Sequence, residues 1–178
     1  MENQRVRLSK ALLKEALLTL LRTKPIEKIT IYDICDIAQI NRSTFYRYYG
    51  SQYELLTAVE NDLFAEIEKH LREREQPDRD GLTKVAEFLE QERDKCRVLI
   101  NSAPEKEFCS KLFALPTVVS MLKDYTPSIY TAKQETYMRL FFCQGGYAII
   151  REWLNSEDRE SPGEIAALIA SFGKRLTT

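Results

Sequence analysis

The chain has little of what metal sites, disulfide frameworks and membrane spans require. Its 178 residues include one histidine and four cysteines, Cys35, Cys96, Cys109 and Cys143, none of them in a C-x-x-C pair. Buried thiols in a reducing compartment are the default for such spacing, so we expect no metal, no cofactor and no disulfide framework. No apolar run approaches the ~18 residues that a membrane-spanning helix needs, so we expect no membrane partner.

Glycine and proline are also scarce, at six each, and strand-type alternation of apolar and polar residues is rare. The content of 44% apolar and 30% charged residues is that of a soluble globular protein. The first ten residues, MENQRVRLSK, lack the apolar segment of a signal peptide. These features favour an all-α, cytoplasmic protein. We do not expect an enzyme, because no nucleophile–base pairing, metal-ligand spacing or phosphate-binding loop is visible.

The charge is distributed unevenly, although the net charge at pH 7 is only −1. Residues 1–56 hold nine Lys/Arg and six Asp/Glu, a net charge of +3. The other residues hold seventeen and twenty-one, a net charge of −4. A basic head on an acidic body is consistent with a nucleic-acid-binding protein, although a difference of this size is common.

The stretch TIYDICDIAQINRSTFYRYYG, residues 30–50, predicts two short helices joined by a tight turn. Thr30 is a good N-cap with Asp33 at capping-box spacing, and apolar residues then recur with helical periodicity. Asn41 is suited to cap the second helix and Gly50 to end it. The pattern predicts a helix-turn-helix, whose second helix enters the major groove of DNA.

The second helix of this motif has an apolar face and a polar, basic and aromatic face. Phe45 and Tyr49 are four residues apart and should point together into the core. The opposite side carries Arg42, Ser43, Tyr46 and Arg47. On an ordinary surface helix, such an arginine would be solvated and such a tyrosine half-buried. Within a helix-turn-helix, Arg42 is suited to bidentate contact with guanine, and Tyr46 to a thymine methyl or a phosphate.

These residues closely resemble the DNA-binding signature of the TetR (tetracycline-repressor-like) transcriptional regulators. The most specific part is TFYRYY, residues 44–49, followed by Gly50-Ser51 and Glu54-Leu55-Leu56, within a resemblance that extends from Arg5 to Val59. The resemblance implies DNA contacts from both helices of the motif and from the residue that opens the next helix. The corresponding positions are Thr30, Tyr32, Arg42, Ser43, Thr44, Tyr46, Tyr48 and Gln52.

Two positions depart from the family pattern. Lysine is usual where Gln52 stands, so one charged phosphate contact is missing and the salt dependence of binding should flatten slightly. Glycine is frequent where Gln39 stands, so the turn should be strained without being abolished. The first departure and the modest charge of the head leave an alternative open, a helical protein-interaction adaptor or co-regulator with a weakened DNA-binding head.

Helical periodicity predicts about nine helices in two domains. The resemblance implies that residues 1–50 form the helix-turn-helix DNA-binding domain and residues 51–178 a helical effector-binding and dimerisation domain, with the helix of residues 51–75 connecting the two. The predicted helices cover residues 6–23, the two motif helices, 51–75, 82–102, 105–125, 132–154 and 161–176. Pro116 should kink or split the helix that contains it, residues 76–81 should form a loop and Pro127 should mark another boundary. Leu8, Leu12 and Ile37 are expected in the core of the head.

Function as a DNA binder implies a homodimer on a palindromic operator, because recognition by a single head is weak. As in the resembled family, the two C-terminal helices would form a four-helix bundle with those of a second copy. The residues predicted at this interface are Gly145, Gly146, Ile149, Trp153, Ile165, Leu168, Ile169 and Phe172. The two adjacent glycines cost roughly 1 kcal/mol each relative to alanine, which a close helix crossing would offset. A bend beside a ligand is the alternative explanation.

A small-molecule effector, if there is one, should bind between the helices of residues 82–154. The candidate lining residues are Phe88, Phe108, Phe113, Met121, Tyr125, Tyr137, Phe141 and Tyr147. Most such apolar residues are ordinary core, and a protein partner in place of a ligand stays open. The sequence predicts a ligand-responsive transcriptional regulator, a repressor released from its operator by the effector.

Overall fold

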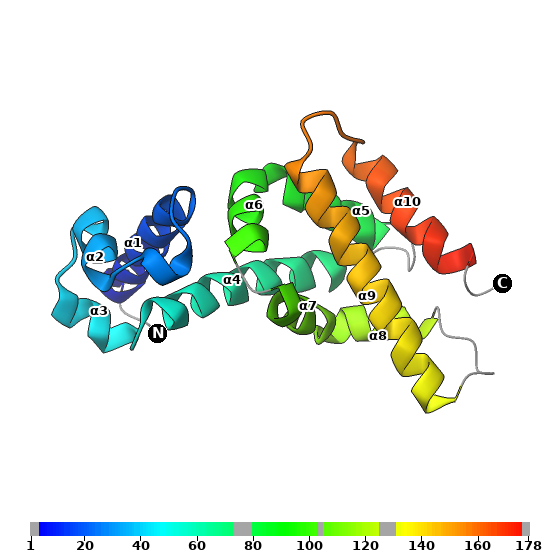
Figure 1. Ribbon diagram of the computed structural model, residues 1–178, viewed down its shortest axis with the longest axis horizontal. Helices are drawn as coiled ribbons and strands as arrows, with labels where there is room; N and C mark the ends of the chain where they lie inside the picture. The colour runs from blue at the N-terminus through cyan, green and yellow to red at the C-terminus, as the bar shows by residue number, and fades with distance from the viewer. Residues whose placement is uncertain (1–3, 73–79, 103–104, 125–130, 176–178) are drawn as a thin grey trace. The chain divides into compact units, whose positions relative to one another are not determined.

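All regular structure in the described part of the chain is helical. The computed structural model describes residues 4–72, 80–102, 105–124 and 131–175, which form ten α-helices and one 3-10 helix (Figure 1). The chain divides into two compact units, residues 1–63 and 64–178. This division falls inside the long helix α4 (Gln52–Arg72).

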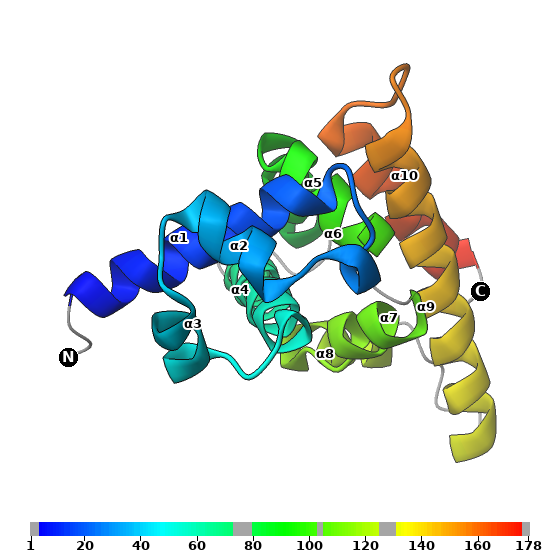
Figure 2. The same ribbon diagram turned by 60° about the vertical axis from the view of Figure 1, so that its left-hand side comes forward.

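Three helices precede α4 in the first unit, with a short 3-10 turn after the first of them. They are α1 (Gln4–Leu21), η1 (Ile26–Lys28), α2 (Ile31–Ala38) and α3 (Arg42–Tyr48), and α1 packs against α2 (Figure 2). The core holds apolar residues from all of these helices. Its members with almost no exposed surface include Leu13, Leu17, Ile29, Ile34, Phe45, Leu55 and Val59. Tyr49 is also buried, with its ring 5.9 Å from that of Phe45, as predicted.

Three residues predicted in the core of the first unit are instead exposed. Leu8, Leu12 and Ile37 have exposed fractions of 60%, 43% and 45%. The buried residues of α1 all lie from Leu13 onward. Helical periodicity therefore identified the correct face of α1. It could not show that the neighbouring helices cover only the C-terminal part of that face.

The second unit contains the end of α4 and six further helices. These are α5 (Asp80–Gln91), α6 (Arg93–Ser102), α7 (Glu105–Phe113), α8 (Pro116–Asp124), α9 (Ala132–Asn155) and α10 (Pro162–Arg175). Helix α10 packs against α5 and α9, and α9 also packs against α6 and α7. Figure 1 shows α9 and α10 side by side, joined by the loop after Asn155.

The predicted helix of residues 82–102 is two helices, α5 and α6, which meet at Glu92. Directly after this break, the Arg93 side chain reaches the end of α9. Its Nε donates to the carbonyl of Leu154 at 3.1 Å, and its Nη2 donates to the carbonyl of Ser156 at 2.8 Å. The single-helix prediction was wrong because no local sequence signal marks a contact between residues so far apart in the chain.

Pro116 splits its predicted helix, since it is the first residue of α8 and follows the end of α7. Proline is favoured at this position because it has no N–H to leave unpaired. The loop predicted over residues 76–81 is wrong for Asp80 and Gly81, which already belong to α5. Residues 76–79 and the boundary predicted at Pro127 lie outside the described residues.

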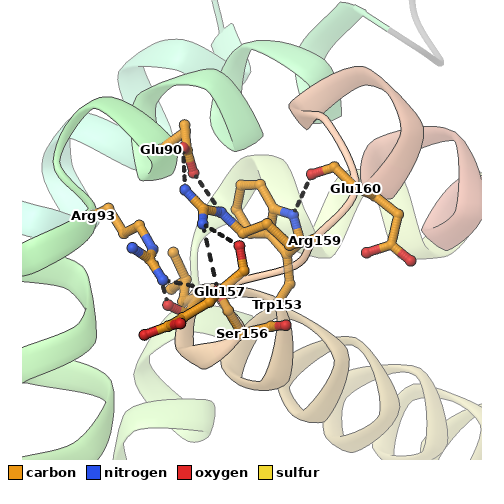
Figure 3. A network of polar contacts seen from close by, with 8 residues as sticks. Glu90, Arg93, Trp153, Ser156, Glu157, Arg159 and Glu160 are labelled. Atoms are coloured by element: carbon orange, nitrogen blue, oxygen red, sulfur yellow. Dashed lines mark hydrogen bonds and ion pairs between the residues drawn. The ribbon is translucent and has the colours of Figure 1, made fainter.

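Polar contacts anchor the loop between α9 and α10 (Figure 3). The guanidinium of Arg159 contacts both carboxylate oxygens of Glu90 on α5, and the indole Nε1 of Trp153 donates to the carbonyl of Glu160 at 2.8 Å. A capping box starts α10, because Ser161 N donates to Glu164 Oε2 at 2.9 Å and Glu164 N donates to Ser161 Oγ. These contacts set the direction in which α10 returns along α5.

All four cysteines are buried, as the sequence predicted, and none of them forms a disulfide. Burial raises the pKa of the Cys96 and Cys143 thiols to about 12. These thiols therefore stay protonated at neutral pH and pack as small apolar side chains. Among the described residues, no helix is long and apolar enough to cross a membrane.

The raised thiol pKa predicts a loss of stability at high pH. The unfolded thiol of Cys96 ionises near 9.0 and the folded one near 12, so the unfolded chain loses its proton first. The free energy of unfolding should fall as the pH rises from 9.0 towards 12, by at most about 1.4 kcal/mol per pH unit. Urea unfolding of the wild type and Cys96→Ala, at about pH 8 and about pH 10.5, measures this loss. An equal loss in both proteins would contradict the assignment to Cys96.

Candidate nucleic-acid interface

The first helix of the motif begins with a reciprocal pair of hydrogen bonds. Asp33 N donates to the hydroxyl oxygen of Thr30, and Thr30 N donates to the Asp33 carboxylate, both at 3.1 Å. The backbone N–H of Thr30, its hydroxyl and the nearby Lys24 ammonium together lower the pKa of Asp33. The predicted capping box is confirmed, and it holds Thr30 exposed at the start of α2.

The turn between the two motif helices depends on Gln39. This residue adopts φ 53° and ψ 43°, the left-handed conformation in which glycine is favoured. Gln39 N donates to the carbonyl of Asp36, and Ile40 N donates to the carbonyl of Cys35 at 3.0 Å, the bond pattern of a Schellman motif. The Gln39 side chain also donates to the carbonyl of Asp36 at 2.6 Å. The strain predicted at this residue thus has a specific origin, offset in part by a local hydrogen bond.

The start of α3 differs from the prediction. Asn41 occupies the N-cap position, but its side chain makes no capping hydrogen bond. Its backbone carbonyl instead accepts from the N–H groups of Thr44 and Phe45, at 2.9 and 3.1 Å. The helix is therefore started by the turn and by the burial of Phe45, and not by the Asn41 amide.

Gly50 is not the left-handed stop that the sequence suggested. Helix α3 ends at Tyr48, and the following residue, Tyr49, is extended at φ −141°. Gly50 N donates to Glu54 Oε2 at 2.7 Å, and a Cβ on Gly50 would lie 2.9 Å from Glu54 Oε1. The glycine therefore belongs to the start of α4, where the Glu54 carboxylate needs a close approach to the backbone.

The outer side of α3 presents the predicted contact residues to solvent. Tyr46 is 58% exposed, and Arg42 and Ser43 are exposed with it, opposite the buried ring of Phe45. Tyr32 on α2 is 65% exposed. The remaining predicted residues are less accessible: Thr44 and Tyr48 on α3 are half-buried, as is Gln52 at the first turn of α4. The structure thus places seven of the eight predicted residues on three successive helices of one unit, and Thr30 at the N-cap of the first of these helices.

Sequence patterns did not predict the role of Lys10. Its ammonium lies 5.6 Å from the centre of the Tyr48 ring, a cation–π contact between α1 and α3. Lys10 and Tyr48 are far apart in the sequence, and no local sequence pattern around either residue predicts their contact. Arg47, which was predicted on the outer side of α3, is also exposed.

Of the candidate effector-lining residues that the structure describes, some are buried and others are exposed. Phe108 packs between Phe64 and Tyr147, with ring centres 4.9 and 5.9 Å away, and Phe88 stacks on His70. The Tyr147 hydroxyl donates to the carbonyl of Ile100 at 3.1 Å. Two others are exposed on α9, namely Tyr137 and Phe141. Tyr125 and the side chains of Phe113 and Met121 lie outside the described residues.

The predicted dimer residues also separate into two sets. A Cβ added to Gly145 or Gly146 would meet no atom within 4 Å. Leu168 and Phe172 on α10 are exposed, and Ile149 and Ile169 are half-buried. Trp153 and Ile165 are instead buried within the chain, where they serve its own core.

The left-handed Gln39 predicts an order of stability among its variants. Gln39→Ala should lower the free energy of unfolding, because alanine keeps the Cβ strain and loses the hydrogen bond to Asp36. Gln39→Gly should be at least about 1 kcal/mol more stable than Gln39→Ala, because glycine adopts this conformation freely. Urea denaturation curves of the two variants and the wild type provide the measurement. Equal stability of the two variants would show that the turn is unstrained.

Comparison with known proteins gives a consistent family. Residues 79–174, just over half of the chain, match a TetR-type family described as "Transcriptional regulator C-terminal region". Over 170 residues the chain is 25% identical to the uncharacterised HTH-type transcriptional regulator YxbF of Bacillus subtilis (strain 168). That match covers 89% of this chain but only 43% of YxbF, so the chain spans less than half of that relative's length.

Two solved structures show the same fold. A TetR transcriptional regulator from Streptococcus agalactiae 2603V has a TM-score of 0.77 at 22% identity, with 96% of each chain covered. The dihydroxyacetone kinase operon activator DhaS has a TM-score of 0.61 at 18% identity, covering 95% of this chain and 96% of its own. With the helix-turn-helix described above and the family match over its C-terminal part, the chain belongs to the TetR family of transcriptional regulators.

Proposed function

We propose that the chain acts in the cytoplasm as a homodimer that binds a palindromic DNA operator and represses transcription until a small-molecule effector releases it. The observation that carries the proposal is the exposed outer side of α3, with Arg42, Ser43 and Tyr46 opposite the buried Phe45. An arginine and a tyrosine there can reach base edges and phosphates when the helix enters the major groove. Thr30, Tyr32 and Thr44 would add contacts on either side of the turn.

Two of the predicted contact residues are less suited to contact DNA than the others. Tyr48 is half-buried beneath the Lys10 ammonium, so it supports the position of α3 at least as much as it contacts DNA. Gln52 is half-buried and uncharged, which removes one phosphate contact of the family pattern. The exposed Arg47 on α3 supplies a cation that can partly compensate for this loss.

The glycines of α9 support a homodimer. No atom of the described residues approaches the missing Cβ of Gly145 or Gly146, so packing among those residues does not require the two glycines. A close crossing with the same helix of a second copy would require them, and Leu168 and Phe172 supply exposed apolar surface on the neighbouring α10. Two copies place two heads on one duplex, where half-sites are roughly 34–36 Å apart.

Effector release would act through the long helix α4, which begins at Gln52 beside the motif and continues to Arg72. A ligand that favours a tilted arrangement of this helix would change the spacing of the two heads and weaken operator binding. Repression is the simplest outcome of such a release. DhaS is named as an operon activator, so a reporter gene under the selected operator has to establish the direction of control for this chain.

A protein-interaction adaptor is the second candidate, and the uncharged Gln52 is the observation that favours it. Both candidates are tested by selecting duplex DNA from a random pool with the purified 178-residue protein, with Arg42→Ala as control. A palindrome enriched by the wild type alone supports the DNA-binding function. Folded, dimeric protein that enriches no sequence would support the adaptor instead, and a search for protein partners would follow.

Substitutions in α3 should separate DNA binding from folding. Arg42→Ala and Tyr46→Ala each remove a long, exposed side chain, so specific binding should be lost while the melting temperature stays near that of the wild type. One lost bidentate contact alone costs about 1–3 kcal/mol. Fluorescence anisotropy with the selected operator measures binding. Arg22→Ala, an exposed arginine after α1, is the matched control. Normal operator binding by both α3 variants would refute the assignment.

The dimer proposal predicts opposite behaviour of two glycines. Gly145→Leu should fit the isolated chain but obstruct a close helix crossing, so the dimer should dissociate at concentrations where the wild type is intact. Gly163→Leu on α10 also meets no atom within 4 Å, and Gly163 lies outside the proposed interface, so it is the control. Sedimentation equilibrium measures both. If Gly145→Leu stays dimeric, α9 does not cross its partner at this residue.

A further inference from the structure

A buried carboxylate lies on the apolar side of α4. Glu68 is surrounded in sequence by the buried residues Phe64, Ile67 and Leu71, and its own side chain is only 12% exposed. Its carboxylate accepts from Thr117 Oγ1 at 2.7 Å and from Arg72 Nε at 2.9 Å. A longer bond at 3.4 Å comes from Thr117 N. We refer to Glu68, Arg72 and Thr117 as the α4–α8 polar cluster.

Thr117 is the partner on which this carboxylate depends most. The Arg72 side chain is 65% exposed, and an ion pair with so much solvent around one partner contributes little. Thr117 is itself buried, and its hydroxyl makes the shortest bond to Glu68. A buried charge that loses such a donor becomes much more costly, so the cluster stabilises one relative position of α4 and α8.

The cluster lies between the part of the body that was predicted to bind an effector and the helix that leads to the motif. Thr117 is the second residue of α8, which also carries Met121. Glu68 is on α4, the same continuous helix that begins at Gln52. A displacement of α8 along α4 must therefore either move α4 with it or separate Thr117 from Glu68.

We propose that the α4–α8 polar cluster is the contact through which the C-terminal body controls operator binding. While Glu68 and Thr117 are paired, α4 is held in the position that DNA binding uses. When α8 moves and the pair separates, that position is lost. Glu68 and Thr117 are thus positioning residues and make no contact with DNA. This inference rests on the proposed function, since it names the regulation of the same DNA-binding head.

The test is the removal of a single hydroxyl. Thr117→Val keeps the shape of the side chain and removes the donor, whereas Thr117→Ser retains it. Thr136→Val is the matched control, because the Thr136 hydroxyl makes only a local bond to the carbonyl of Ala132 on the exposed side of α9. The dissociation constant for the selected operator and the melting temperature are measured for each variant of the full chain.

Thr117→Val should raise the operator dissociation constant about tenfold, within the range typical of coupling between sites. The dissociation constants of Thr117→Ser and Thr136→Val should stay within about twofold of the wild-type value. Thr117→Ser keeps the hydroxyl that contacts Glu68, and Thr136 takes no part in that contact. A lower melting temperature of Thr117→Val with an unchanged dissociation constant would assign the cluster a purely structural role and overturn the proposal. If Thr117→Val fails to fold, Glu68→Gln removes the charge at similar volume and should also raise the dissociation constant.

Hydrogen exchange provides a second measurement, because a purely structural role of the cluster predicts no effect of operator binding on amide exchange in α8. Because coupling is reciprocal, operator binding should slow amide exchange in α8 of the wild type and not of Thr117→Val. If operator binding does not change the amide exchange of α8 in the wild type, the proposal is overturned while the proposed function stays intact. A wild type that binds no duplex would overturn both.

Discussion

The burial of Phe45 is the constraint on which the candidate site depends. Helix α3 has only seven residues, so fixing one side of it also fixes the other. The Phe45 ring has no exposed surface and contacts the buried Tyr49, which turns Arg42 and Tyr46 outward. The Asn41 side chain adds no capping bond, so the outward face of α3 is set by core packing together with the turn at Gln39.

This dependence explains why the motif tolerates an unfavourable residue in its turn. A non-glycine residue in the left-handed conformation costs about 1–2 kcal/mol. Gln39 recovers part of that through its own hydrogen bond to the carbonyl of Asp36, and the Schellman bonds pair the last carbonyls of α2. The angle between α2 and α3 is therefore maintained by several weak local bonds around one strained residue, Gln39. The burial of the Phe45 ring then fixes the orientation of α3.

Features that a few neighbouring residues determine were predictable from the sequence. The capping box at Thr30 follows from local hydrogen bonding and was correct, and of the kink or split predicted at Pro116 the structure shows the split. The break at Glu92 was missed because local sequence does not reveal that the next residue, Arg93, donates to the carbonyls at the end of α9. Gly50 was misassigned because a glycine after a helix resembles a left-handed stop, whereas here it makes room for the Glu54 carboxylate.

The candidate site residues also include some that the local sequence pattern predicted correctly and some that it could not place. Helical periodicity sufficed to place Arg42 and Tyr46 outside and Phe45 inside, because the two sides of a short helix are set by spacing alone. It could not separate core from surface in the body, where Phe108 and Tyr147 are packed together and Phe141 is exposed. An aromatic residue satisfies the same pattern in either place, and only the neighbouring helices decide which it occupies.

The second unit combines two kinds of contact with different consequences for movement. Apolar contacts such as that between Phe64 and Phe108 have no strict direction, so helices can slide slightly while burying the same surface. The bond between Thr117 and Glu68 is directional and short, and it is either made or broken. If the proposed regulation holds, a helix held by both kinds of contact would move between discrete positions instead of drifting continuously. Discrete positions are what a regulator requires if a small change in the body is to alter the affinity of its head for DNA.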